Sequence, residues 1–169
     1  MRLSPTVGIP KDGAARDSLV QTVDRFSAKT ISTYTGGDWS EKDVVQARSI
    51  LDECGISVGE FCWMRVDLNA SLSEQTEEFK RHLSHGALLK AHCAGFAMKP
   101  EGATPFDPVT EKNWDRETWL RCLDRVAVLL QIAQEQDMVV AAHPHLLTPL
   151  NSIARYRELL GSFNTRHLK

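Results

Sequence analysis

The 169-residue sequence lacks several features that would point to common classes of protein. Its 4 cysteines form no C-x-x-C pair, which argues against a zinc ribbon or a thioredoxin-type site. A net charge of −2 gives no electrostatic support for binding nucleic acid or an anionic membrane. No apolar run is long enough to span a bilayer, and residues 1–10 lack the layout of a signal peptide. We therefore expect a cytoplasmic protein with buried thiols and with neither a nucleic-acid nor a membrane partner.

The composition is that of an ordinary globular domain. Hydrophobic residues make up 42% of the chain and charged residues 25%. A chain of this length can bury a core as one domain. The glycine pair Gly36-Gly37 lacks the spacing of a phosphate-binding loop, so we interpret it as a turn.

Short β-like runs alternate with helical stretches along the chain. Ser40, Ser73 and Asn113 are the expected N-terminal caps of three helices, and Gly55, Gly86 and Gly161 follow expected helix ends. Strands are expected at 6–9, 29–34, 56–63, 88–94 and 138–143, with the start of a sixth at 166–168.

Strands that alternate with helices imply a parallel sheet. Each strand–helix unit takes roughly 30 residues, so a complete eight-unit barrel needs about 250. The sequence therefore predicts an α/β fold of the (β/α)8 TIM-barrel type that is incomplete, with about five units and the start of a sixth strand in one partial domain, 1–169. An open, doubly wound sheet is the alternative, although the sequence lacks the glycine-rich fingerprint that such sheets use for dinucleotides.

Four segments carry a family resemblance: Ala91–Gly95 (AHCAG), Asn113–Trp119 (NWDRETW), Val139–His145 (VVAAHPH) and Thr148–Ser152 (TPLNS). Together they resemble the xylose isomerase-like TIM-barrel superfamily, which includes sugar-phosphate isomerases and epimerases. The resemblance implies a carbohydrate substrate and a divalent metal (Mn, Mg, Co or Zn) at the carboxyl ends of the strands. The metal stabilises an enediolate while carboxylates move the proton.

The sequence departs from that family pattern at the metal. The family carries Glu at the end of strand five, followed two residues later by His, whereas this chain has His143-Pro144-His145. The other three family ligands, Asp, His and Glu of later strands, would lie beyond Lys169. His143 is thus the remaining metal candidate, and imidazole suits Zn better than Mg or Mn. We expect the inherited isomerase or epimerase chemistry to be absent from this chain alone, which leaves its status as an enzyme uncertain.

Strand periodicity selects three further side chains. In the expected third and fourth strands, Glu60, Lys90 and His92 lie on the faces opposite the more apolar ones, so they would point into the barrel. Glu60 and Lys90 would then form either a structural ion pair or a catalytic acid–base pair. His92, like His143 and His145, would either contact a substrate or metal or form structural hydrogen bonds. His82 and His85, on a polar helix, are expected to be solvated.

The expected connection 95–112 is long enough to act as a lid or a binding loop, or to pack on its own barrel. Phe96 and Phe106 are candidates for covering a sugar ring, with Trp63 as a stacking wall. The second functional hypothesis is a non-catalytic partial barrel that assembles with another chain, including a second copy, through its open strand edges.

Overall fold

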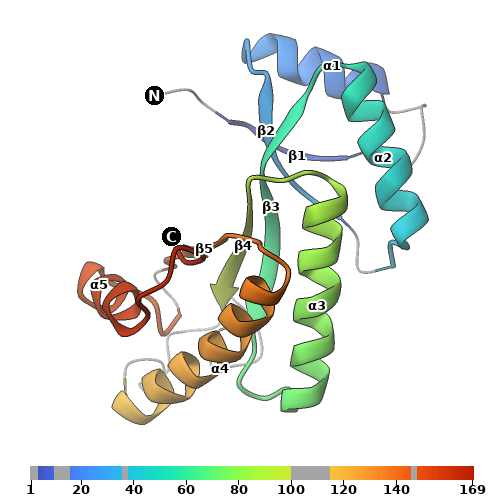
Figure 1. Cartoon of the computed structure of the whole chain (residues 1–169). Coiled ribbons are helices and arrows are strands. Elements are labelled where there is room, and N and C mark those ends of the chain that lie inside the picture. Colours follow the sequence, from blue (N-terminus) through green and yellow to red (C-terminus); the bar gives the residue numbers. More distant parts are fainter. Residues whose placement is uncertain (1–3, 10–15, 36–37, 100–114, 146–147) are drawn as a thin grey trace. The chain divides into compact units, whose positions relative to one another are not determined.

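In the computed structural model, strands and helices alternate from β1 to α5 (Figure 1). The structure describes residues 4–9, 16–35, 38–99, 115–145 and 148–169, without the side chain of Trp63. The elements, in chain order, are β1 (Thr6–Gly8), α1 (Arg16–Arg25), β2 (Thr30–Tyr34), α2 (Glu41–Glu53), β3 (Ser57–Val66), α3 (Leu72–Leu88), β4 (Cys93–Met98), α4 (Arg116–Glu135), β5 (Val140–His143) and α5 (Ile153–Ser162).

The five strands form one sheet in the order β1-β2-β3-β4-β5. The β1–β2 and β2–β3 pairs are parallel, and Leu168 continues the series through a parallel bridge to Val140. Strands that follow one another in space as in sequence are the arrangement of a barrel, whereas a doubly wound sheet reverses its order at a switch point. The predicted α/β barrel-type fold is confirmed, and the doubly wound alternative is wrong.

By internal contacts the chain divides into two units. The first consists of residues 1–62 and 83–94, and the second of residues 63–82 and 95–169. Within the described residues, no helix combines the length and apolar character that crossing a membrane requires.

The core of the first unit shows why the helical periodicity was informative. Val44, Ala47 and Leu51, which share one face of α2, are fully buried together with Ile31 of β2 and Val58 of β3. Arg48 is buried beside these residues, and its guanidinium donates to the carbonyl oxygens of Ile56 and Leu89, both at 2.9 Å. His85 is also buried here, with its ring centroid 6.5 Å from that of Phe61, so its predicted solvation is wrong.

Helix starts were predicted to within two residues. Ser40 caps α2 in a capping box with Asp43, as expected. Helix α3 is capped by Ser71 rather than Ser73, because the side chains of Ser71 and Glu74 satisfy each other's backbone N–H groups. The cap of α4 is Asp115, whose carboxylate accepts the N–H of Thr118 at 2.6 Å; the predicted cap, Asn113, lies outside the described residues.

Helix ends were harder to predict, because most lack glycine. Four helices end in the same pair of backbone hydrogen bonds, the Schellman motif, around a residue with positive φ. That residue is Gly55 after α2, as predicted, but it is Ser27 after α1, Lys90 after α3 and Asp137 after α4. Gly86 and Gly161, which were expected to end helices, lie inside α3 and α5.

The position of Lys90 moves the fourth strand. Helix α3 continues to Leu88 and turns at Lys90, so β4 begins at Cys93 instead of Leu88. Strand β3 likewise extends to Val66, beyond the predicted end at Trp63. Both shifts bring new residues to the carboxyl ends of the strands.

Candidate functional site

A pocket of about 160 Å³ lies at the carboxyl ends of β3, β4 and β5, within the second unit. Exposure alternates at the carboxyl ends of two of these strands: in β4, Phe96 and Met98 are buried while Ala97 is half-buried, and in β5, Ala142 is buried while His143 is half-buried. Successive side chains of a strand point to opposite faces of the sheet. We call this cavity the strand-end pocket; its lining residues are Arg65, Gly95, Phe96, Ala97, Met98, Lys99, His143, Pro144, His145 and Thr148.

Three of the predicted site residues meet at this pocket. His143 is the last residue of β5, and His145 follows it in an exposed turn. The N–H of His145 donates to the carbonyl oxygen of Leu150, and the N–H of Thr148 donates to the carbonyl oxygen of His145, both at 3.0 Å. Phe96 also lines the pocket.

The surroundings of Phe96 correct one prediction. Phe96 was expected in a loop, but it lies inside β4 and is only 1% exposed, so its ring is part of the core. Residues 100–112 of the expected binding loop, including Phe106, lie outside the described residues, as does the side chain of Trp63.

The structure does not bring the predicted Glu60–Lys90 pair together. Lys90 lies in the turn after α3, is exposed, and places its Nζ 3.4 Å from a carboxylate oxygen of Asp52. The hydrogen bond from Arg48, together with Lys90, lowers the pKa of Asp52 below its ordinary value, against an opposing effect of desolvation. The ion-pair prediction is wrong because Lys90 belongs to a helix-ending turn and not to a strand.

The other two predicted side chains occupy the first unit. Glu60 is half-buried on β3, as expected for a strand residue. His92 is exposed and precedes β4, and its backbone N–H donates to the carbonyl oxygen of Val58 at 3.2 Å. The catalytic roles assigned to Glu60 and Lys90 and the binding role assigned to His92 stay predictions.

An ion pair at the strand ends was not predicted. Asp67 directly follows β3 and Lys99 directly follows β4, and the Lys99 Nζ donates to the Asp67 carboxylate at 2.6 Å. Burial raises the pKa of Asp67, but the hydrogen bonds from Lys99 and from the N–H of Asn69, with the charge of Lys99, outweigh it and lower the pKa overall. If the predicted third and fourth strands had ended at Val66 and Met98, the sequence would have placed Asp67 and Lys99 side by side at the carboxyl ends of the strands.

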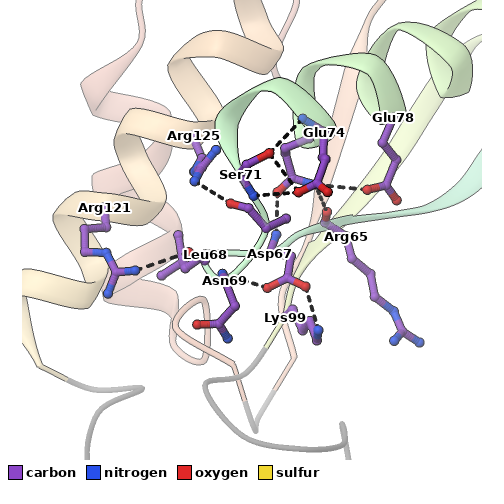
Figure 2. Close-up of polar contacts among 12 residues, drawn as sticks. Arg65, Asp67, Leu68, Asn69, Ser71, Glu74, Glu78, Lys99, Arg121 and Arg125 are labelled. Atoms are coloured by element: carbon purple, nitrogen blue, oxygen red, sulfur yellow. Dashed lines mark hydrogen bonds and ion pairs between the residues drawn. The ribbon is translucent and has the colours of Figure 1, made fainter.

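The loop that carries Asp67 is held on several sides (Figure 2). The fully buried side chain of Gln75 accepts the N–H of Asp67 at 2.6 Å and donates to the carbonyl oxygen of Arg65 at 3.0 Å. From α4, Arg121 and Arg125 donate to the carbonyl oxygens of Leu68 and Ala70, at 3.3 and 2.8 Å. Figure 2 also shows the guanidinium of Arg65 extending away from the Asp67–Lys99 pair.

The donor set of the strand-end pocket bears on the expected metal. His143 and His145 offer imidazoles, but the described lining residues include no carboxylate and do include the cations Arg65 and Lys99. Hard divalent ions such as Mg²⁺ and Mn²⁺ prefer oxygen ligands, and a tight site normally takes three or more protein ligands. These lining residues do not by themselves fit a magnesium or manganese ion.

Comparison with solved structures identifies the fold. The chain superposes on D-psicose 3-epimerase in the presence of D-fructose with a TM-score of 0.71 at 13% identity, over 99% of this chain and 62% of that one. For 3-keto-D-glucoside 4-epimerase (YcjR) from E. coli the TM-score is 0.68 at 14% identity, over 100% and 66% of the two chains. For a xylose isomerase-like TIM-barrel protein from Mycobacterium smegmatis in complex with magnesium it is 0.70 at 10% identity, over 99% and 62%.

No family model and no curated protein sequence matches the chain. The chain spans less than two thirds of the length of these three solved structures. The expected resemblance is confirmed by structure: the chain has the fold of the xylose isomerase-like TIM barrels and corresponds to part of one.

Proposed function

We propose that this chain carries part of the ligand-binding mouth of a sugar isomerase or epimerase-like barrel and binds a small carbohydrate in the strand-end pocket. One observation carries the proposal: polar groups from three neighbouring strands or the turns after them converge on one cavity at their carboxyl ends. This is the end at which barrel enzymes bind and transform substrates. The similarity to two sugar epimerases supports the same class of ligand.

The size of the pocket agrees with a ligand of this kind. Its volume is about 160 Å³, close to the roughly 150 Å³ cavity that holds a benzene molecule in an engineered protein. The ring of a six-membered sugar is of comparable size. Imidazoles both donate and accept hydrogen bonds, so His143 and His145 suit hydroxyl and carbonyl oxygens.

The same residues limit the chemistry that the chain performs alone. Isomerisation or epimerisation next to a carbonyl needs a base for the α-proton and positive charge beside the enolate oxygen. Lys99 supplies positive charge at the pocket. The described pocket lining offers no carboxylate as a base. We therefore propose that the isolated chain binds a sugar without turning it over.

Two measurements test this function. D-Fructose is titrated into ¹⁵N-labelled chain, and His143→Ala and His145→Ala are compared with Lys80→Ala, whose side chain is exposed and is not among the pocket lining. We expect shifts at the strand-end pocket and an affinity that the first two variants lower several-fold and the third leaves unchanged. Absence of saturable binding would contradict the proposal.

The second measurement is an aldose–ketose isomerisation assay of the purified chain with Mg²⁺, Mn²⁺ or Co²⁺ added. We expect no conversion above the metal-only blank. Clear turnover that tracks the protein concentration would contradict the proposed lack of activity.

A second candidate function is assembly without catalysis. Strand β1 lies at one end of the strand order, and the segment at Leu168 follows β5 at the other. Within the described residues, neither has a further strand beside it. Unpaired strand edges are sites of association, so a second copy of this chain is the simplest partner.

A further inference from the structure

The charge of the strand-end pocket is one-sided. Among its described lining residues, Arg65 and Lys99 are cationic and none is acidic. The remaining lining is apolar or neutral, apart from the two imidazoles. A cavity with low-dielectric walls and charge of one sign concentrates ligands of the opposite sign.

Lys99 is held in place at the rim of this pocket. Its side chain is 29% exposed, and its Nζ lies 2.6 Å from the carboxylate of Asp67, which is itself 20% exposed. Asp67 is fixed in turn by the N–H of Asn69, which donates to its second oxygen at 2.9 Å. An ammonium has three hydrogens to donate, so Lys99 retains donors for a ligand after binding Asp67.

Arg65 adds a positive charge that no described carboxylate neutralises. Its carbonyl oxygen is anchored by Gln75, but within the described residues its guanidinium has no ion-pair partner. A guanidinium presents parallel N–H groups that match the two oxygens of a carboxylate or phosphate. Among the described residues, Asp67 therefore pairs with one of the two pocket cations, Lys99, and no carboxylate pairs with Arg65.

We infer that the strand-end pocket binds an anionic ligand: Lys99, positioned by Asp67, contacts its carboxylate or phosphate group, and the charge of Arg65 at the same pocket attracts that group. This inference rests on the proposed function and narrows it from a small carbohydrate to an anionic one, such as a sugar phosphate or sugar acid. Asp67 is a positioning residue here, because it touches Lys99 and not the ligand.

The test compares three carbohydrates and one simple anion by NMR titration at fixed ionic strength: D-fructose, D-fructose 6-phosphate, D-gluconate and inorganic phosphate. We expect at least one of the two anionic carbohydrates to bind ten-fold or more tightly than D-fructose. Comparing the two separates a phosphate from a carboxylate as the recognised group. Equal affinities for all three carbohydrates would overturn the inference.

Variants then locate the anion. Arg65→Gln and Lys99→Gln should each remove most of the ten-fold preference, whereas Lys99→Arg should keep part of it. The matched control is Lys80→Gln, which removes the same charge from the surface of α3, where Lys80 pairs with Glu77 at 3.0 Å. If Arg65→Gln and Lys99→Gln keep the full preference while their amide spectra remain those of the folded chain, the inference is wrong.

Asp67→Asn separates positioning from simple charge. Removing a nearby negative charge by itself raises the affinity for an anion, whereas loss of positioning lowers it. We expect the preference for the anionic ligand to fall, and a rise would overturn the positioning role. If neither D-fructose nor the anionic sugars bind but inorganic phosphate does, with the same sensitivity to Arg65 and Lys99, the proposed function fails and the anion site stands.

Discussion

At the residue scale, Asp67 is a carboxylate of the second unit that lies directly after β3 and accepts a hydrogen bond from Lys99, directly after β4. Its pKa in the folded chain is below the ordinary value of 3.8, since the hydrogen bonds from Lys99 and Asn69 outweigh the effect of burial. A carboxyl group with a lowered folded pKa contributes stability above its unfolded pKa and loses that contribution as the pH falls through its folded pKa.

This behaviour predicts a pH dependence for the difference between the wild-type chain and Asp67→Asn. Urea unfolding should show the wild type more stable by a constant amount from pH 7 to about pH 5. The difference should shrink below the ordinary carboxyl pKa and vanish once Asp67 is protonated in the folded chain. Glu77→Gln removes an exposed pair with Lys80, which is worth about 0–1 kcal/mol, and serves as the control. A difference that does not change with pH would contradict this account.

At the scale of single elements, the start of α3 offers two serines that differ in role. The Ser71 hydroxyl accepts the N–H of Glu74, and the Glu74 carboxylate accepts the N–H of Ser71. The hydroxyl of Ser71 and the N–H of Ser71 both donate to the Glu74 carboxylate and lower the pKa of Glu74, against a smaller opposing effect of desolvation. Ser73, which has a similar sequence context, lies inside the helix and is exposed.

We therefore predict that Ser71→Ala lowers the free energy of unfolding by about 1 kcal/mol, since an N-cap is lost. Ser73→Ala should be neutral or slightly stabilising, because alanine favours a helix interior. Thermal or urea unfolding of both variants measures the contrast. Equal effects of the two substitutions would show that Ser71 is not the cap.

The ends of the helices lead to a second prediction about elements. The Schellman turns after α1 and α2 have the same hydrogen bonds, but the positive-φ residue is Ser27 in one and Gly55 in the other. A residue with a side chain lowers the free energy of unfolding by about 1–2 kcal/mol in this positive-φ conformation. Glycine avoids this cost, but it also gives the unfolded chain more conformational entropy, which offsets part of the gain in stability.

Ser27→Gly should therefore raise the free energy of unfolding by up to about 1 kcal/mol, and Gly55→Ala should lower it by about 1 kcal/mol. No heavy atom outside the adjoining residues lies within 4 Å of a Cβ added at Gly55, so crowding does not contribute to the second effect. Urea unfolding measures both changes. Changes of the same sign would contradict the assignment of strain to these turns.

For the whole molecule, the proposed assembly depends on the free edge of β1. Pro5 accepts a hydrogen bond from the N–H of Ser32, so the backbone groups of Thr6 face away from β2, toward the open side. If two copies associate through this edge, light scattering should give twice the monomer mass of 18.9 kDa.

Thr6→Pro should then return the chain to a monomer, because proline removes the outward N–H and leaves the β2-facing groups in place. The control is Thr33→Val, which removes a side-chain hydrogen bond to Val7 without changing any backbone donor. A wild-type monomer at high concentration would count against assembly as the function.

The sequence by itself determined the alternation of elements, the parallel sheet, the capping of α2 and the position of His143 and His145 at the end of β5. These features depend on local periodicity and on residues a few positions apart. Only the tertiary structure decided that α3 ends at Lys90, that His85 is buried, and that Asp67 meets Lys99 across 32 residues of sequence. Such contacts depend on where two strands end in space, and a shift of a few residues in each end changes which side chains reach the pocket.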